Sequence, residues 1–160
     1  MDKSWLQQQV LERRAADLRQ AEQALRAAHE TATHEENIAE NKYDTLGLEA
    51  AYLATGQARR AEAIRQAMAM WRQFRPSPYD ASKGIQLGAL VCLVDSDDRQ
   101  QQLFLGPDGG SMKLASGAEL VQVISIDAPL GRAMLGKCEG DEVSIRVAPS
   151  RQQFEVLRVH

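Results

Sequence analysis

The sequence predicts an α+β fold, in which an N-terminal antiparallel hairpin of two long α-helices precedes a small antiparallel sheet domain with one short helix. Three observations predict this fold. Residues 4–74 contain no proline and are rich in alanine, leucine, glutamine, glutamate and arginine, which are strong helix formers. Apolar residues recur every seven residues along the same stretch, as in a coiled coil. From residue 85 onward, short apolar runs alternate with turn residues, which is typical of strands.

The helical hairpin is expected to fill residues 1–75, with Ser4 as the N-cap of its first helix. The stretch Arg75-Pro76-Ser77-Pro78 ends the second helix, because proline cannot continue it. We therefore expect a linker at residues 76–84 and the sheet domain at residues 85–160.

Each arm of the hairpin carries a heptad seam. The first-arm seam consists of Leu11, Leu18, Ala21, Leu25, Ala28 and Ala32. The second arm has two sets of seam positions, namely Tyr43, Ala50, Gln57, Ile64 and Trp71, and Leu46, Leu53, Arg60, Ala67 and Phe74. Two seams of similar length favour an intramolecular hairpin, and hence a monomer, over a single long helix that dimerises.

The reversal between the arms is expected between Thr31 and Asn41, where the seam is weakest and the threonine and asparagine residues favour caps and turns. A chain that folds back near residue 37 would bring Arg14 level with Arg60 and Glu62. We expect a polar layer at that level to fix the register of the two helices.

The C-terminal domain is expected to contain strands at residues 89–94, 102–105, 120–126, 143–147 and 154–156. Residues 95–98 read as a turn. The stretch from Pro129 to Leu135 predicts a short helix, because a proline stands near its start and Gly136 follows its end.

Charge and composition exclude several classes of protein. The chain of 160 residues has a formal net charge of −3 and no excess of basic residues, so tight sequence-independent binding to duplex nucleic acid is not expected. No apolar run approaches the roughly 20 residues that span a bilayer, and the N-terminus lacks the apolar core of a signal peptide. Cys92 and Cys138 are expected to be free thiols. We expect a cytoplasmic protein with no membrane partner and no sequence-specific DNA partner.

No complete catalytic site is readable in the sequence. It contains neither a glycine-rich phosphate loop nor a recognisable Ser/His/Asp arrangement. His29 and His34 are five residues apart and would point to different faces of a helix, which does not suit a zinc site. The chain is therefore not expected to be an enzyme in its own right.

Acidic residues gather where the two arms are expected to meet. Residues 30–49 contain six acids and one base, Lys42, whereas both flanking arms are rich in arginine. Glu36 and Glu40 would share a helical face, and Asp44 would add a third carboxylate. Such a tip has too few ligands for a metal cage, so we expect no cofactor of its own and at most a Mg²⁺ ion shared with a partner. The alternative is a solvated acidic turn.

Several stretches of the chain match the sequence elements of a known family. The stretch from Ile126 to Lys137 is similar to an "SP-x-A-R-A-L-x-G-K" element, and residues 139–143 are similar to the G-D-x-V strand that follows it. Residues 154–159 resemble the family's last strand, and residues 40–43 resemble its "ENAEY" motif. By these motifs the chain resembles the bacterial Gre factors, the GreA and GreB type of transcript cleavage factor, over nearly its whole length.

The resemblance implies a specific role for the hairpin. Gre factors insert their hairpin into the secondary channel of RNA polymerase, where acids at its tip help to hold a catalytic Mg²⁺ ion. The polymerase then cleaves backtracked RNA near its 3′ end, so the factor contacts the RNA only indirectly and acts in trans. On this basis Glu36, Glu40 and Asp44 are the candidate catalytic and metal-facing residues.

The resemblance also implies a role for the C-terminal domain. In the family this domain is FKBP-like and docks on the rim of the channel. The candidate partner-binding residues are Asp127, Ala128, Pro129 and Arg132. Prolyl isomerase activity is not expected, because Phe104 and Phe154 are the only aromatic residues after Tyr79 and cannot line an aromatic pocket.

The tip departs from the family's "D-L-K-E-N-A-E-Y" pattern, in which the two working acids are three residues apart. Aligning on Glu40 places Asn37 at the first acid, and aligning on Tyr43 places Glu36 at the first acid and Ala39 at the second. Two hypotheses follow: an altered ligand set that still promotes cleavage, or a non-cleaving occupant of the channel that regulates or inhibits transcription. A coiled-coil adaptor unrelated to polymerase is the third.

Overall fold

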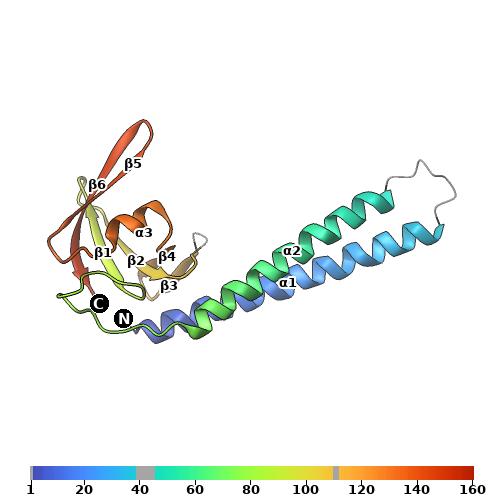
Figure 1. Ribbon diagram of the computed structural model, residues 1–160, viewed down its shortest axis with the longest axis horizontal. Coiled ribbons are helices and arrows are strands. Elements are labelled where there is room, and N and C mark those ends of the chain that lie inside the picture. The colour runs from blue at the N-terminus through green and yellow to red at the C-terminus, as the bar shows by residue number, and fades with distance from the viewer. Residues whose placement is uncertain (1, 39–45, 110–111) are drawn as a thin grey trace. The chain divides into compact units, whose positions relative to one another are not determined.

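The structure, a computed structural model, describes residues 2–38, 46–109 and 112–160, with the backbone alone for residues 35–38 and 46 (Figure 1). The chain divides into two compact units. One unit is Leu11–Ala69, and the other combines the chain up to Val10 with Met70–His160. The predicted division into residues 1–75, 76–84 and 85–160 stays a prediction.

The two long helices are α1 (Lys3–Ile38) and α2 (Leu46–Gln73). Asp2 begins α1, because its Oδ1 accepts the backbone N–H of Ser4 at 2.9 Å. Asp2 rather than the predicted Ser4 is therefore the N-cap, since a cap accepts from the residue two or three positions later. In the described part of the chain, neither helix is long and apolar enough to cross a membrane.

In the unit Leu11–Ala69, the two helices pack along a seam of small apolar residues. The buried centre of this seam consists of Ala21, Ala61, Ile64 and Met68, with Leu11, Ala15 and Leu18 packed against it. The seam continues through the buried residues Ala28, Ala32, Ala50 and Ala54. The seam predicted for the first arm is confirmed.

One of the two sets of seam positions predicted for α2 is right in part. Ala67 and Phe74 are buried as expected, Leu46 has no described side chain, and the two positions between are wrong. Leu53 is 57% exposed and Arg60 is exposed, whereas Ala54 and Ala61, one residue later, are buried. The observed stripe follows residues 50, 54, 57, 61, 64 and 68, which have the alternating spacing of four and three that a coiled coil requires. Leu53 is more apolar than alanine, but the distance between two helix axes depends on the side chains at the contact, and alanine permits a closer approach.

The reversal between the helices begins later than the sequence predicts. Helix α1 continues through Thr31 and Asn37 to Ile38. The Thr31 hydroxyl donates to the carbonyl of Ala27 at 3.0 Å, so it is satisfied inside the helix rather than at a cap. The connection between α1 and α2 falls at residues 39–45, which lie outside the described residues.

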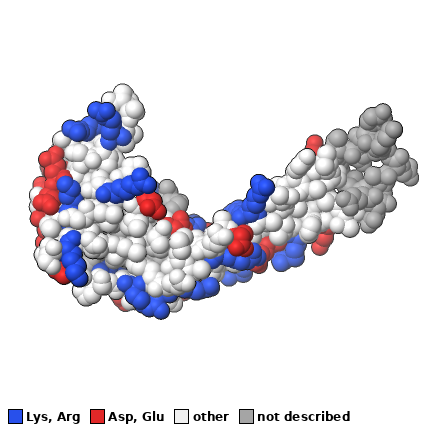
Figure 2. All heavy atoms as spheres, viewed as in Figure 1, with Lys and Arg blue, Asp and Glu red and all other residues white. Residues whose placement is uncertain are grey.

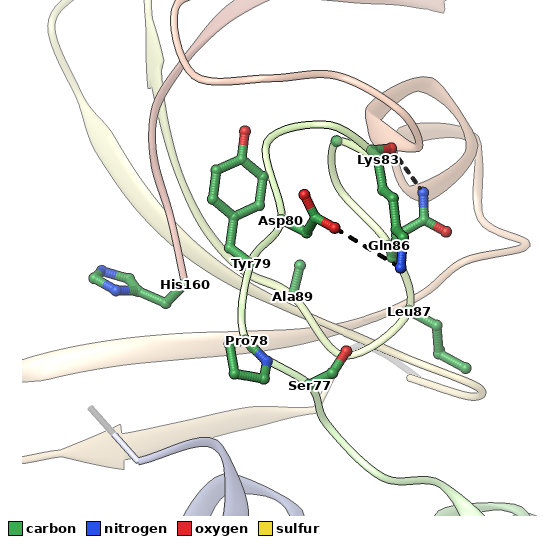
Figure 3. A pocket seen from close by; sticks show the side chains of 10 residues that line it. Ser77, Pro78, Tyr79, Asp80, Lys83, Gln86, Leu87, Ala89 and His160 are labelled. Atoms are coloured by element: carbon green, nitrogen blue, oxygen red, sulfur yellow. Dashed lines mark hydrogen bonds and ion pairs between the residues drawn. The ribbon is translucent and has the colours of Figure 1, made fainter.

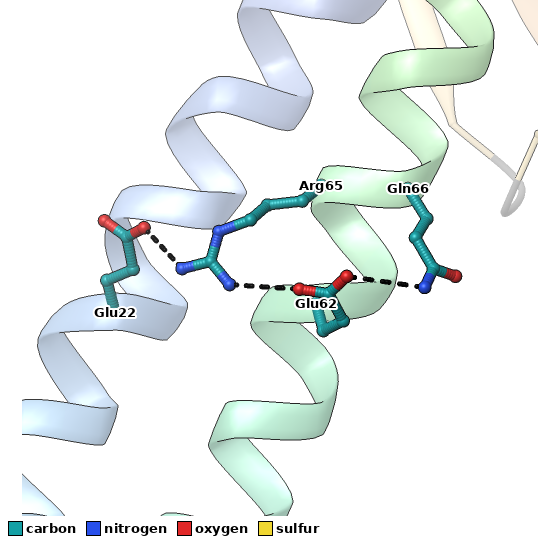
Figure 4. Close-up of polar contacts among 4 residues, drawn as sticks. All are labelled: Glu22, Glu62, Arg65 and Gln66. Atoms are coloured by element: carbon teal, nitrogen blue, oxygen red, sulfur yellow. Dashed lines mark hydrogen bonds and ion pairs between the residues drawn. The ribbon is translucent and has the colours of Figure 1, made fainter.

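A cross-helix ion pair marks the register within this unit. The Arg65 guanidinium donates to Glu22 Oε1 at 2.9 Å and lies 3.5 Å from Glu62 Oε2 on its own helix (Figure 4). This register does not bring Arg14 level with Glu62, so the predicted polar layer is wrong. The expected reversal near residue 37 lies too early in the chain, and that error shifts every expected cross-helix neighbour.

The second unit contains a six-stranded sheet with the strand order β3-β4-β2-β1-β6-β5. Its strands are β1 (Leu90–Asp95), β2 (Gln100–Gly106), β3 (Lys113–Ser116), β4 (Glu119–Ser125), β5 (Glu142–Val147) and β6 (Ser150–Val159). The five expected strands are present. The sequence gives no signal for β3, because this strand has four residues, of which only Leu114 is buried.

The sheet is mixed rather than purely antiparallel. Strands β2 and β4 are parallel, whereas every other neighbouring pair is antiparallel. The unexpected β3 explains the difference. It forms a hairpin with β4 around Gly117, which has φ +61°, and β4 therefore returns beside β2 in the same direction as β2.

The short helix α3 (Pro129–Met134) covers one face of this sheet. The core beneath it contains Ile85, Val91, Leu93, Leu103, Leu105, Ile124, Met134, Val143, Val156 and Val159. A second cluster joins the end of α2 to β2, where the Trp71 ring centroid lies 5.5 Å from Phe74 and 5.9 Å from Phe104. Gln7 Nε2 donates to the carbonyls of Trp71 and Phe74 at 2.6 and 2.8 Å, which satisfies acceptors at the end of α2.

Candidate functional site

The three predicted metal-facing residues belong to the connection between α1 and α2. Glu36 lies in the last turn of α1, where the structure describes only the backbone. Glu40 and Asp44 lie outside the described residues. Within the described part of the chain, no three His, Cys, Asp or Glu side chains form a group that could hold a metal ion. The shared role of the three carboxylates stays a prediction.

The four predicted partner-binding residues lie together in residues 125–132, here called the docking segment. Asp127, Pro129 and Arg132 are exposed, and Ala128 is partly buried against the core. Ser125 holds the turn, because its hydroxyl accepts the N–H of Asp127 at 3.1 Å and its carbonyl accepts the N–H of Ala128 at 3.1 Å. Pro129 begins α3, where a missing N–H leaves no hydrogen bond unmade. A fixed backbone thus presents an acid, a proline ring and a guanidinium.

Gly131 determines the shape of the docking segment, and the sequence reasoning does not single it out. A Cβ atom at this position would lie 2.1 Å from the carbonyl oxygen of Ser125. Any larger residue would therefore push α3 away from the end of β4. The available signal is a glycine inside a short helix, where its propensity is poor. Such a glycine indicates a close approach of two backbones.

The loop before β1 holds the other end of α3. The Ile85 N–H donates to the Lys137 carbonyl at 2.8 Å, and the Ile85 carbonyl accepts the N–H of Gly136 at 2.8 Å. Gly136 has φ +79°, the left-handed conformation that commonly ends a helix, so the predicted stop is confirmed. A Cβ atom on Gly84 would lie 2.4 Å from the Gly136 carbonyl oxygen. Both ends of α3 are therefore fixed by backbone contacts.

A hollow of about 180 Å³ lies beside this loop and is lined by residues from Ser77 to Ala89 and by His160 (Figure 3). Within it, Asp80 Oδ1 accepts the hydroxyl of Ser82 at 2.7 Å and its N–H at 3.0 Å. These hydrogen bonds, with a smaller contribution from the Lys83 charge, hold the pKa of Asp80 below its ordinary value. The Lys83 ammonium lies 3.7 Å from Asp80 Oδ2.

The polar groups beside this hollow contact each other within the loop. Asp80 and Lys83 are exposed and neutralise each other, and the residues lining the hollow include no nucleophile held against a base. Loss of solvent contact raises the pKa of Tyr79 above its ordinary value. A side-chain hydrogen bond with Cys138 raises it further. The Cys138 thiol donates to the Ala81 carbonyl at 3.5 Å. These contacts hold the loop beside the sheet.

The sheet-bearing part of the chain matches a protein-family model. Residues 80–160 match the model described as "Transcription elongation factor, GreA/GreB, C-term". This range contains all six strands, α3 and the whole docking segment.

Similarity to individual proteins extends to the helices. The chain is 31% identical over 153 residues to the transcription elongation factor GreA of Desulfovibrio desulfuricans, covering 94% of this chain and 87% of that protein. It is 38% identical over 74 residues to GreA of Vibrio cholerae serotype O1, a match that spans 45% of this chain and 43% of that protein. Among solved structures, Gfh1 of Thermus aquaticus aligns with a TM-score of 0.40 at 22% identity, covering 93% of this chain and 92% of Gfh1.

The family model accounts for the docking segment and the sheet, and the relative from Desulfovibrio desulfuricans accounts for nearly the whole chain, helices included. The chain belongs to the GreA/GreB family of transcription elongation factors.

Proposed function

We propose that this protein binds bacterial RNA polymerase through its secondary channel and promotes Mg²⁺-dependent cleavage of backtracked RNA during elongation. The observation that carries the proposal is the similarity to a GreA protein over 94% of the chain, which includes both helices as well as the sheet. A match confined to the sheet would support docking but not insertion of a hairpin.

The dimensions of the helices suit entry into a narrow channel. Helix α1 has 36 residues and α2 has 28, which correspond to lengths of about 54 and 42 Å at 1.5 Å per residue. The alanine seam keeps the pair slender, and the ion pair between Glu22 and Arg65 opposes sliding of one helix along the other.

The acids of the connection supply the chemistry that the proposal requires. Glu36, Glu40 and Asp44 would contribute carboxylate oxygens, the ligands that Mg²⁺ prefers. A bound Mg²⁺ ion lowers the pKa of a coordinated water and offsets charge on the phosphodiester. The remaining ligands would come from the polymerase, so the protein acts in trans and is not itself an enzyme. Asp127, Ala128, Pro129 and Arg132 would hold it on the channel rim.

A stalled, backtracked elongation complex with 5′-labelled RNA tests this function. We expect added protein to shorten the RNA from its 3′ end in the presence of Mg²⁺ and not after chelation. A complex that binds the protein, as shown by competition with an established channel-binding factor, but keeps its RNA intact would reject cleavage.

That negative result would support a second function, a non-cleaving occupant of the channel that alters initiation or pausing. The specific observation in its favour is the tip sequence, in which only Lys42 separates Glu40-Asn41 from Tyr43, so the family spacing of the two acids is not reproduced. Absence of any binding to core polymerase would instead favour the coiled-coil adaptor.

A further inference from the structure

Strands β5 and β6 place like charges directly opposite each other. Glu142 pairs in register with Glu155, and Arg146 pairs with Arg151. Between them lies the polar pair Ser144 and Gln153. All six side chains are exposed, and residues directly opposite each other in an antiparallel pair point to the same face. They form one surface, here called the charge stripe, with two acids at one end and two arginines at the other.

This arrangement works against the stability of the ribbon. Like charges directly opposite each other destabilise a strand pair, whereas opposite charges stabilise it. In the described part of the chain, none of Glu142, Glu155, Arg146 and Arg151 takes part in an ion pair. No direct ion pair to a described residue therefore offsets the like charges within each pair. A local departure from the favourable pairing rule is expected at surfaces that serve a function.

The charge stripe is accessible because the outer part of the ribbon extends beyond the rest of the sheet. Pairing between β1 and β6 stops at Asp95 opposite Phe154, so residues 150–153 of β6 pair only with β5 (Figure 1). The other face of the ribbon is also partly open, since Val147 is 49% exposed. Figure 2 shows basic side chains over the outer end of this ribbon and acidic side chains below them along the same edge of the unit.

We propose that the charge stripe is a second docking surface for RNA polymerase, distinct from the docking segment. The matching surface of the partner carries the opposite charges in the same spatial order. A basic group faces Glu142 and Glu155, and an acidic group faces the arginine pair Arg146 and Arg151. The two ends of the stripe are four residues apart on β5, or about 14 Å at 3.4 Å per residue. This proposal rests on the proposed function, because the partner is the same polymerase.

The two signs on one stripe favour a protein partner over a nucleic acid. A phosphate backbone carries negative charge throughout and would be repelled by Glu142 and Glu155 as strongly as it is attracted by Arg146 and Arg151. A protein surface can match both ends at once. Charges at the rim of an interface set orientation and association rate more than affinity, so the stripe orients the sheet domain while the docking segment binds.

The sharpest test rearranges the charges without changing their number. In the double variant Glu155→Lys with Arg146→Glu, both like-charge pairs become opposite-charge pairs, and the net charge of the chain stays the same. We expect its thermal unfolding midpoint to equal or exceed that of the wild type. We expect its dissociation constant for core RNA polymerase to rise about three- to ten-fold at low salt, with the difference shrinking as salt screens the charges.

A matched control lies at the opposite edge of the sheet. Lys113 on β3 and Glu119 on β4 are exposed, and their exchange in K113E/E119K also preserves net charge. We expect this control to bind polymerase as the wild type does. A stripe variant that binds equally well, or that unfolds at a lower temperature than the wild type, would overturn the proposal.

Two further variants identify the partner's charge. R146E/R151E makes the stripe wholly acidic, and E142K/E155K makes it wholly basic. Both weaken binding if the partner carries both signs, whereas opposite effects on affinity would point to a surface of one sign, such as nucleic acid, and would overturn the proposal. Failure of the wild-type protein to bind polymerase would reject the proposed function together with this proposal. Wild-type binding that the stripe variants leave unchanged would reject this proposal alone.

Discussion

A Cβ atom on Gly106 would lie 2.2 Å from Cη2 of Trp71, because the indole occupies the space beside the last residue of β2. Trp71 is fully buried and also contacts Phe104, so the end of α2 is seated directly on the sheet. The Trp71 indole can therefore pack against the end of β2 only because residue 106 has no side chain.

Substitution of Gly106 by alanine is expected to destabilise the protein by about 1–3 kcal/mol, since either the indole or β2 must shift. Chemical unfolding followed by circular dichroism measures the change. Gly56→Ala is the control, because nothing lies within 4 Å of a Cβ atom there and the residue is inside α2. We expect that change to stabilise by about 0.5–1 kcal/mol. Equal effects at the two glycines would contradict the steric explanation.

The ion pair between Glu22 and Arg65 is expected to contribute about 0.2–1 kcal/mol, because both side chains are partly exposed to water. A double-mutant cycle with Glu22→Gln and Arg65→Gln measures this coupling, which should fall in about 1 M salt. Arg59 is exposed on the same helix and provides the control, with no coupling to Glu22 expected. Coupling of the same size at Arg59 would show a general charge effect instead.

Stability should depend on pH through Asp80, whose pKa is lowered by hydrogen bonds from Ser82. A carboxyl with a lower pKa in the folded state contributes stability above its unfolded pKa of about 4, and that contribution is lost as pH falls through the folded value. Asp80→Asn should therefore destabilise at pH 7 and have less effect at pH 3. Urea unfolding of Asp80→Asn and the wild type at both pH values tests this. A difference that is independent of pH would rule out the ionised carboxylate as the cause.

The docking segment is expected to act through its exposed side chains. Arg132→Glu should weaken binding to core polymerase by at least about ten-fold without lowering the unfolding midpoint. The guanidinium is exposed, and the substitution keeps the backbone N–H that donates to the Ala128 carbonyl. Gly131→Ala should weaken binding and also destabilise, since its Cβ atom would collide with Ser125. Arg99→Glu, on another exposed turn, is the control and should bind normally.

The tip acids are expected to affect catalysis rather than binding. Glu36→Gln, Glu40→Gln and Asp44→Asn should each lower the rate of RNA cleavage while the affinity for polymerase stays near that of the wild type. Glu30→Gln, earlier on α1, should leave the rate unchanged. Retention of full cleavage by the three variants together would show that these carboxylates do not hold the ion.

Long, periodic elements were predictable from the sequence, and positions decided by packing were not. The hairpin, the first-arm seam and the strand around Val91 follow from repeats that extend over many residues. The choice between Leu53 and Ala54 depends instead on how closely two helices approach, which single-residue hydrophobicity does not report. Asp2 rather than Ser4 caps α1. The two residues are both suitable caps and stand two positions apart, so the sequence alone does not decide between them.

The sheet topology and the candidate site also contain features that were predictable from the sequence and features that were not. The parallel pairing of β2 with β4 depends on β3, a strand too short for its pattern to be recognised. The turn and short helix of residues 125–132 were predictable from the sequence because their motif is local, and their binding role stays a prediction. The register that opposes Arg146 to Arg151 was not predictable, because a cross-strand pairing depends on the turn that joins two strands.

Strand β6 lies between β1 and β5 and pairs with both of them, although the ribosome synthesises it after either. Until β6 emerges, the apolar strand β1 has one unpaired edge, which is a template for pairing with another chain. Contacts within the helical hairpin bring together residues from one continuous stretch and form before that moment. We therefore expect a nascent chain to form its hairpin while its sheet is still open, and to be most exposed to pairing with other chains during that interval.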